Sequence, residues 1–148
     1  EAALEDIRRT PQYPFGVQLL TYALISASFS LFFGGSAADA VASGLIGVVL
    51  RYLDRSIRRT EANAFPSALI CSCLGGLLAA LSVRAGLGES VDMISIGNIM
   101  LLIPGIPLTN SLRDMFTGNT ISGLLRFSEA ILLALAIAFG FAAVAALM

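Results

Sequence analysis

Residues 93–116 read MISIGNIMLLIPGIPLTNSLRDMF, an apolar run that Pro104, Gly105 and Pro107 interrupt near its middle. A proline removes a backbone N–H group and clashes with the preceding helical turn, so this segment should stop a helix. In hydrocarbon, the freed backbone groups are costly unless protein or water satisfies them. The sequence therefore predicts a helix broken at 104–107, where the chain is buried in protein or borders a wet cavity.

The chain around this break is too apolar for a soluble globule. Of its 148 residues, 57% are hydrophobic and 13% are charged, whereas about a quarter of the residues in a soluble domain are charged. The apolar residues also fall in runs of about the 20 residues that a membrane-spanning helix needs. We expect an all-α polytopic membrane protein with about five transmembrane helices, the fourth of them broken. The expected spans are 14–33, 37–53, 65–83, 93–116 and 120–148.

The arginines predict the orientation of these spans, because cytoplasmic loops are enriched in basic residues. With five crossings, Arg84 is the only arginine on one side of the membrane. The N-terminus is therefore expected in the cytoplasm and the C-terminus outside. The polar residues 1–12 are expected to end an upstream soluble region. The arginines on the cytoplasmic side are Arg8, Arg9, Arg51, Arg55, Arg58, Arg59, Arg113 and Arg126.

The composition argues against an enzyme, a metal site or a cofactor site. The chain has no His and no Lys, so the usual bases that activate a Ser or Thr nucleophile are missing. Cys71 and Cys73 are two residues apart and point to different faces of a helix, so we interpret both as packing residues. The net charge of −1 gives no indication of a nucleic-acid partner.

Broken helices are where many transporters bind their substrates. A half-helix that starts near Pro107 would present free N–H groups and a positive dipole end to a carboxylate. Thr109 and Asn110 would add hydrogen bonds, and Asn98 would face the same space. The alternative is a simple kink or the end of a span, with 108–116 lying along the cytoplasmic interface. The candidate substrate-binding residues are Asn98, Pro104, Gly105, Pro107, Thr109, Asn110 and Arg113.

Ionisable groups inside a membrane segment are functional candidates by default. We expect Arg113 to reach Glu129 or an anionic substrate, and Asp114 and Glu129 to couple transport to an ion. The alternative is that Arg113 and Asp114 lie among the lipid head groups and only set the topology. Arg126 and Glu129 are three residues apart on one helix face and are expected to form an ordinary ion pair.

Residues 102–126 carry a wider pattern: Pro-Gly, a small apolar pair, Asn, Asp, Gly, a hydrophobic run and a second Gly. It resembles the threonine/serine exporter family, and within that family the larger, YjjP-like subunit of the split, two-gene form. Tyr13-Pro14 before the first span, and Gly34-Gly35 ahead of Asp39, agree with the resemblance. The residues that match the pattern are Pro104, Gly105, Pro107, Asn110, Asp114, Gly118 and Gly123.

This resemblance implies a bacterial inner-membrane exporter of threonine and serine that draws on the proton motive force. For the split form it implies succinate as the alternative substrate, handled together with a second small membrane subunit. It also implies a soluble region before the first span and a second membrane half, either fused or separate, so we expect a hetero-oligomer. A function of another class, a non-transporting membrane scaffold or regulatory module, would make the break a packing kink.

Overall fold

The computed structural model describes residues 14–58 and 63–147, and within these ranges every regular element is an α-helix. The prediction of an all-α fold is confirmed. The expected end of an upstream region at 1–12 lies outside the described residues. The helices are α2 (Phe15–Phe32), α3 (Ala37–Arg58), α4 (Ala64–Arg84), α5 (Val91–Leu102), α6 (Gly105–Phe116) and α7 (Thr120–Ala146).

Three of these helices, α2, α4 and α7, are long and apolar enough to cross a membrane, and the bent pair α5–α6 is a candidate for a fourth crossing. The 22 residues of α3 make a helix about 33 Å long, which is enough to span the hydrocarbon. However, α3 carries Asp39, Arg51 and Asp54 within its length. The structure thus supports three or four crossings, and a fifth through α3 remains a prediction.

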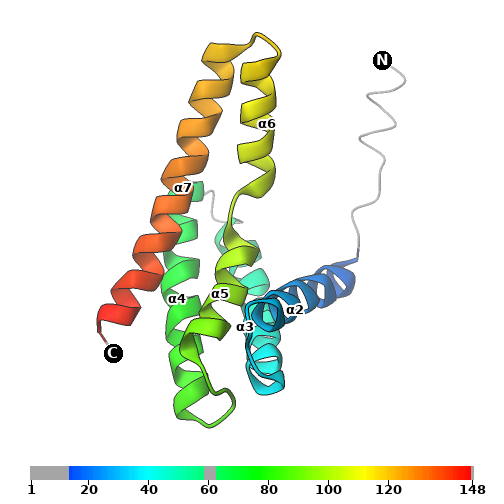
Figure 1. The fold of residues 1–148 in the computed structure, drawn as a ribbon, viewed down its shortest axis with the longest axis vertical. Coiled ribbons are helices and arrows are strands. Elements are labelled where there is room, and N and C mark those ends of the chain that lie inside the picture. Colours follow the sequence, from blue (N-terminus) through cyan, green and yellow to red (C-terminus); the bar gives the residue numbers. More distant parts are fainter. Residues whose placement is uncertain (1–13, 59–62, 148) are drawn as a thin grey trace.

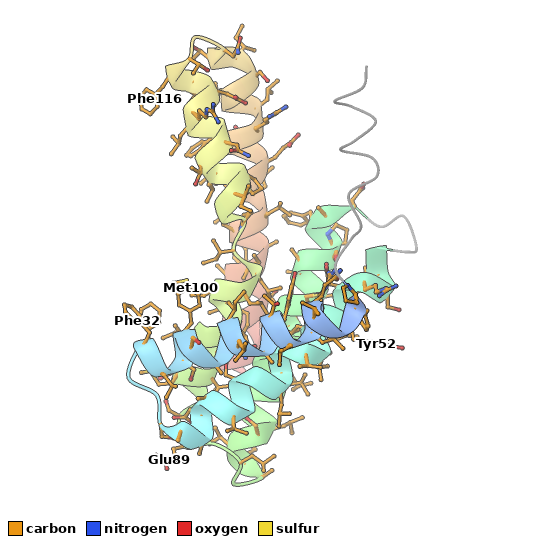
Figure 2. The ribbon with its side chains drawn as sticks, turned by 90° about the vertical axis from the view of Figure 1, so that its right-hand side faces the viewer. Phe32, Tyr52, Glu89, Met100 and Phe116 are labelled. Carbon is orange, nitrogen blue, oxygen red and sulfur yellow. The ribbon has the colours of Figure 1, made fainter. Side chains whose placement is uncertain are left out.

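The helices form two groups. α4, α5 and α7 run along the long axis of the molecule, whereas α2 lies across it (Figures 1 and 2). α6 and the start of α7 form a hairpin that projects beyond the other helices, and α6 contacts no described helix except α7 (Figure 1). Phe116, at the end of α6, and Glu89, in the loop before α5, mark the opposite ends of the molecule (Figure 2).

Glycines permit the close approach of the helices. A Cβ atom at Gly47 of α3 would lie 3.0 Å from the Tyr22 carbonyl oxygen of α2. A Cβ atom at Gly140 of α7 would lie 3.0 Å from the Cys73 amide nitrogen of α4. Helices in lipid associate by such backbone approach, because lipid tails are as apolar as the helix surfaces.

Asp39 links the beginning of α3 to the loop before α5. Its carboxylate accepts hydrogen bonds from the Ser36 N–H at 3.0 Å and the Ser36 hydroxyl at 3.1 Å, while Ser36 Oγ accepts from the Asp39 N–H at 3.2 Å. This reciprocal arrangement is a capping box. Asp39 also accepts from the N–H groups of Glu89 and Ser90, at 2.7 and 2.9 Å. The loop before α3 and the loop before α5 are therefore joined at one end.

Candidate functional site

The helix break lies at Ile103 and Pro104, between α5 and α6, and bends the chain by 48°. α6 begins at Gly105 and not near Pro107. The Gly105 N–H donates to the Ile103 carbonyl oxygen at 2.8 Å, and the Leu108 N–H donates to that of Pro104 at 3.1 Å. Since Pro107 has no N–H, Ile106 has the one first-turn amide without a partner among the described residues. The set of free N–H groups expected from the sequence is therefore not present.

A cavity of about 310 Å³ borders this break. That volume is at the lower end of the range of small-molecule sites, about 300–1,000 Å³. Pro104 and Pro107 both line it, so the prediction that the break borders open space agrees with the structure. The other lining residues come from α3, α4, α5 and α7, and they are Asp54, Ala64, Ser67, Ala68, Cys71, Leu102, Leu133 and Ile137.

The cavity lies near one end of α3 and α4 but about halfway along α7, where it is lined by Leu133 and Ile137. Its α4 residues fall between Ala64, where the helix begins, and Cys71, a distance of about 10 Å along a helix axis. Its α3 residue, Asp54, is four positions before the end of that helix. Because α7 is itself a candidate span, the break lies level with the middle of one candidate crossing, and its depth in a membrane remains a prediction.

Asp54 is the one acidic side chain among the residues that line the cavity. Its Oδ2 lies 3.1 Å from Arg51 Nη1, and the two side chains are 16% and 21% exposed. Arg51 also donates to Gln18 Oε1 at 2.6 Å, and its guanidinium lies 5.1 Å from the Tyr22 ring centroid. The charged stretch from Arg51 is open in the sequence to two interpretations, a solvated loop or an extension of the helix, and the structure shows the helix continuing to Arg58. Asp54 was not among the candidate site residues, and the signal that could have found it is the Arg-x-x-Asp spacing on this helix.

Polar residues of the hairpin continue from the cavity along one edge. On α6, Asn110 and Asp114 follow the cavity residue Pro107 by three and seven positions. On α7, Glu129 and Arg126 precede the cavity residue Leu133 by four and seven positions. Such spacings place side chains on one helix face. We call these four residues, Asn110, Asp114, Arg126 and Glu129, the polar edge.

The polar edge contains an ion pair that the sequence did not predict. Arg126 Nη1 lies 3.2 Å from Asp114 Oδ2, across the two helices of the hairpin. The expected pair of Arg126 with Glu129 is not formed, because the antiparallel packing of α6 on α7 brings Asp114 closer. Glu129 is exposed and has no ion-pair partner among the described residues. The structure thus brings both predicted coupling carboxylates to the edge that leads to the cavity.

Three other predicted site residues lie elsewhere. Arg113 is seven positions after the highly exposed Ile106 and shares its face of α6, away from α7. The Thr109 hydroxyl is exposed and donates to the carbonyl oxygen of Gly105 at 2.9 Å, within its own helix. Asn98 is fully buried and is not among the residues that line the cavity.

Asn98 belongs instead to a buried cluster of hydroxyl groups that joins α2, α3 and α5. Asn98 Oδ1 accepts from Ser26 Oγ at 2.9 Å, and Asn98 Nδ2 donates to the Ile94 carbonyl oxygen at 2.9 Å. Ser26 Oγ lies 2.7 Å from Ser43 Oγ. Buried polar groups require such partners, and hydrogen bonds of this kind hold helices together in lipid. The environment of Asn98 is therefore typical of a structural residue.

The described residues contain no group of three or more His, Cys, Asp or Glu side chains arranged to hold a metal ion. Cys71 is buried and Cys73 is half-buried, and neither forms a disulfide bond.

Comparison with known proteins gives a consistent result. A family model described as "Putative threonine/serine exporter" matches residues 1–148. The chain is 28% identical over 133 residues to the "Probable succinate transporter subunit YjjP" of Klebsiella aerogenes, covering 87% of this chain and 50% of that protein. It is 27% identical over 133 residues to the protein of the same name from Escherichia coli, covering 87% and 51%.

A third relative is the "Threonine/serine exporter" of Corynebacterium glutamicum, which is 24% identical over 137 residues, covering 89% of this chain and 28% of that protein. The chain thus spans about half the length of the first two relatives, and less of the third. No solved structure matches the chain.

Proposed function

Because the chain belongs to the threonine/serine exporter family, we propose that it is a membrane subunit of a secondary transporter that exports threonine and serine from the cytoplasm. The cavity at the helix break carries this proposal. A transporter needs a solute-sized space beside backbone that can rearrange, and broken helices provide both. The space of about 310 Å³ beside Pro104 and Pro107 meets the requirement of size.

The charge of the cavity favours an amino acid over a dicarboxylate. An ammonium group can pair with Asp54, and Arg51, already 3.1 Å from Asp54, would receive the carboxylate of the same zwitterion. Succinate could place one carboxylate at Arg51, but its second carboxylate would meet the like charge of Asp54. Ser67 also lines the cavity. Succinate is the alternative substrate, since two relatives carry that name.

For energy coupling we propose a proton that binds to Glu129. This carboxylate lies on the polar edge, and protonation there would break no ion pair of the described residues. Asp114 forms an ion pair with Arg126, and this charged pair would keep the polar edge hydrated when the solute passes. Pro104 would hold the chain open by separating α5 from α6, while Gly105 and Pro107 lie in the first turn of α6, where Pro107 has no N–H group to donate.

We further propose that a second membrane half, on the same chain or a separate subunit, completes the transporter in a bacterial inner membrane. The relatives named as subunits are about twice as long as the matched region, and the described helices provide three or four candidate crossings. The proposed N-terminus is cytoplasmic and the C-terminus external, which follows from the arginine distribution.

The proposal is tested by efflux from liposomes that contain the full-length protein and its partner half. The liposomes are loaded in turn with radiolabelled threonine, serine and succinate. We expect efflux of threonine and serine, reduced about tenfold or more by Asp54→Asn, because a charge-assisted hydrogen bond to the ammonium is lost. Asp92→Asn is the matched control, since Asp92 is an exposed carboxylate at the first turn of α5, and it should leave efflux unchanged.

Two outcomes would reassign the function. Efflux of succinate without efflux of threonine or serine would favour the dicarboxylate alternative. If no solute leaves, and if Pro104→Ala and Pro107→Ala change only the stability of the complex, the protein is a scaffold or regulatory module and the break is a packing kink.

A further inference from the structure

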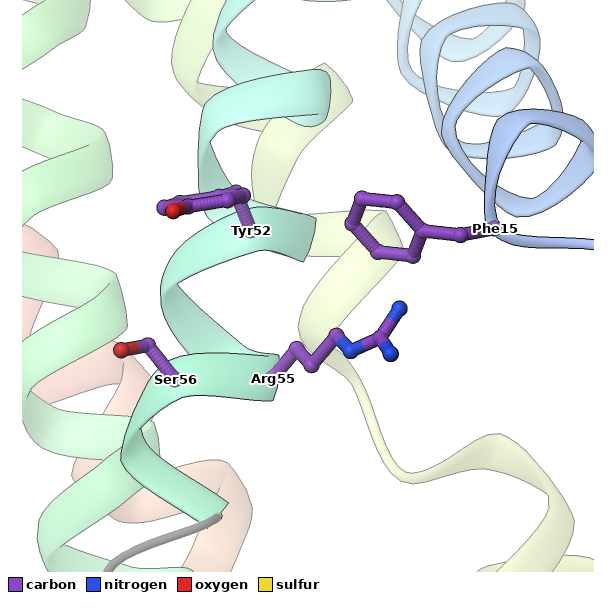
Figure 3. Close-up of a pocket in the computed structure, with 4 residues that line it drawn as sticks. All are labelled: Phe15, Tyr52, Arg55 and Ser56. Carbon is purple, nitrogen blue, oxygen red and sulfur yellow. The ribbon is translucent and has the colours of Figure 1, made fainter.

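A second cavity, of about 290 Å³, lies at the charged end of α3 and is lined by Phe15, Tyr52, Arg55 and Ser56 (Figure 3). It shares no lining residue with the cavity at the helix break. The side chains of Arg55 and Phe15 point toward each other from α3 and α2 (Figure 3). The guanidinium carbon of Arg55 lies 4.3 Å from the centroid of the Phe15 ring.

The chemistry of Arg55 in this position suits an oxyanion. Stacking on Phe15 occupies the face of the guanidinium and leaves its N–H edge available for acceptors. Among the described residues no carboxylate pairs with Arg55, since the ion pairs there join Arg51 to Asp54 and Arg126 to Asp114. The guanidinium presents a fork of donors that matches two oxygens of a phosphate. Its stacked arrangement also lowers the entropy that is lost when such a ligand binds.

An apolar stripe on α3 leads away from this cationic end. Its members are spaced four, four and three residues apart, so they share one face of the helix, and their exposed fractions are 65, 60, 42 and 64%. The stripe is about 17 Å long, close to the 15 Å of hydrocarbon in one leaflet of a bilayer. Its residues are Val41, Leu45, Val49 and Tyr52.

We propose that this pocket binds the phosphate head group of an anionic phospholipid, whose acyl chain lies along the stripe on α3. The phosphate pairs with Arg55, and the rings of Phe15 and Tyr52 flank the glycerol region, where aromatic side chains are common at membrane interfaces. A free phosphate has the same oxyanion chemistry but would make no use of the stripe. The site does not depend on the transport proposed above, because it shares no residue with the cavity at the break.

The test is native mass spectrometry of the full-length protein released from nanodiscs that contain phosphatidylglycerol and phosphatidylcholine in equal amounts. We expect phosphatidylglycerol to remain bound preferentially, and Arg55→Ala to lower its occupancy about fivefold, the effect of one basic residue at an anionic surface. Arg84→Ala is the matched control: Arg84 is an exposed arginine in the last turn of α4, outside this pocket. It should retain the wild-type occupancy.

Three further measurements complete the test. Arg55→Lys keeps the charge but loses the fork, so its occupancy should lie between those of wild type and Arg55→Ala. Leu45→Glu should lower lipid occupancy without touching the pocket, because it charges the stripe. Excess inorganic phosphate should not displace the lipid; displacement would show that the pocket recognises free phosphate instead. Equal occupancy in Arg55→Ala and Arg84→Ala, or no preference for phosphatidylglycerol, would overturn the proposal.

Discussion

The substitution Gly140→Ala tests the packing that forms the wall of the cavity at the helix break. A Cβ atom at Gly140 would lie 2.7 Å from Ser72 Cβ and 3.0 Å from the Cys73 amide nitrogen of α4. Carbon atoms prefer separations of about 3.5–4.0 Å, so α4 and α7 must move apart. Overpacking costs about 1–3 kcal/mol, and these two close contacts place Gly140→Ala in the upper part of that range, at about 2–3 kcal/mol. The better helix propensity of Ala returns about 1 kcal/mol of that cost.

We therefore expect Gly140→Ala to lower the free energy of unfolding by about 1–2 kcal/mol, which corresponds to a Tm lower by about 5 °C. The assay uses Cys71, which is 1% exposed, in a Cys73→Ser background because Cys73 is only half-buried. A thiol-reactive dye then labels Cys71 only when α4 separates from its neighbours. Gly16→Ala is the control, since no atom lies within 4 Å of a Cβ placed there. Its Tm should be unchanged or slightly higher.

A second substitution makes this prediction refutable. Ser72→Gly removes the Cβ atom that Gly140→Ala would strike, so the double variant should recover most of the Tm that the single variant loses. Because α4 and α7 both line the cavity, the double variant should also recover threonine efflux. If Gly140→Ala is as stable as wild type, or if Ser72→Gly gives no rescue, the described contact between α4 and α7 is incorrect.

Three more predictions concern ionisable side chains. Asp39→Asn should lower the free energy of unfolding by about 1–3 kcal/mol, because charge-assisted hydrogen bonds to two loops are lost. Thermal unfolding should show no such loss for Asp92→Asn. If Asp39→Asn is as stable as Asp92→Asn, Asp39 does not link the two loops. Glu129→Gln should leave the Tm unchanged, because Glu129 has no ion-pair partner among the described residues, and it should abolish the dependence of efflux on a pH gradient. If that dependence is retained, Glu129 does not carry the coupling proton. Arg113→Ala should leave threonine efflux close to wild type while Asp114→Asn reduces it severalfold, and the reverse order would show that Arg113 contacts the solute.

Local chemistry made the helices and the break predictable from the sequence. Long apolar runs can only be helices in lipid, since every backbone group must be satisfied within the segment. The proline pair acts through its own missing N–H and ring, whatever surrounds it. The expected break at 104–107 therefore overlaps the observed one, at Ile103 and Pro104, by one residue, and Pro107 lies in the first turn of α6.

Contacts between distant residues could not be predicted in the same way. Spacing favoured Glu129 as the partner of Arg126, but the true partner, Asp114, is 12 residues away and is brought close by the hairpin. Asn98 was placed by its distance from the break, yet it bonds to Ser26, 72 positions earlier. The level of the break along the bundle likewise depends on which helix lies beside α5, and that is a property of tertiary packing.

The polar edge of the hairpin supports the proposal of a second membrane half. Asp114 and Arg126 are 30% and 62% exposed, and α6 contacts only α7 among the described helices. An exposed ion pair costs several kcal/mol if it faces hydrocarbon, so this edge must face water or another protein.

Water alone would suffice if the hairpin stood outside the membrane. However, the hairpin also carries the apolar side chains Leu112, Phe116 and Leu124, which are 43, 88 and 56% exposed. A hairpin with one charged edge and one apolar edge is stable where lipid or protein covers the apolar side and a hydrated passage runs along the other. In the orientation proposed above, a solute that leaves the cytoplasm passes Asp114 and Arg126 before it reaches Asp54, and the proposed second half supplies the opposite wall of its path.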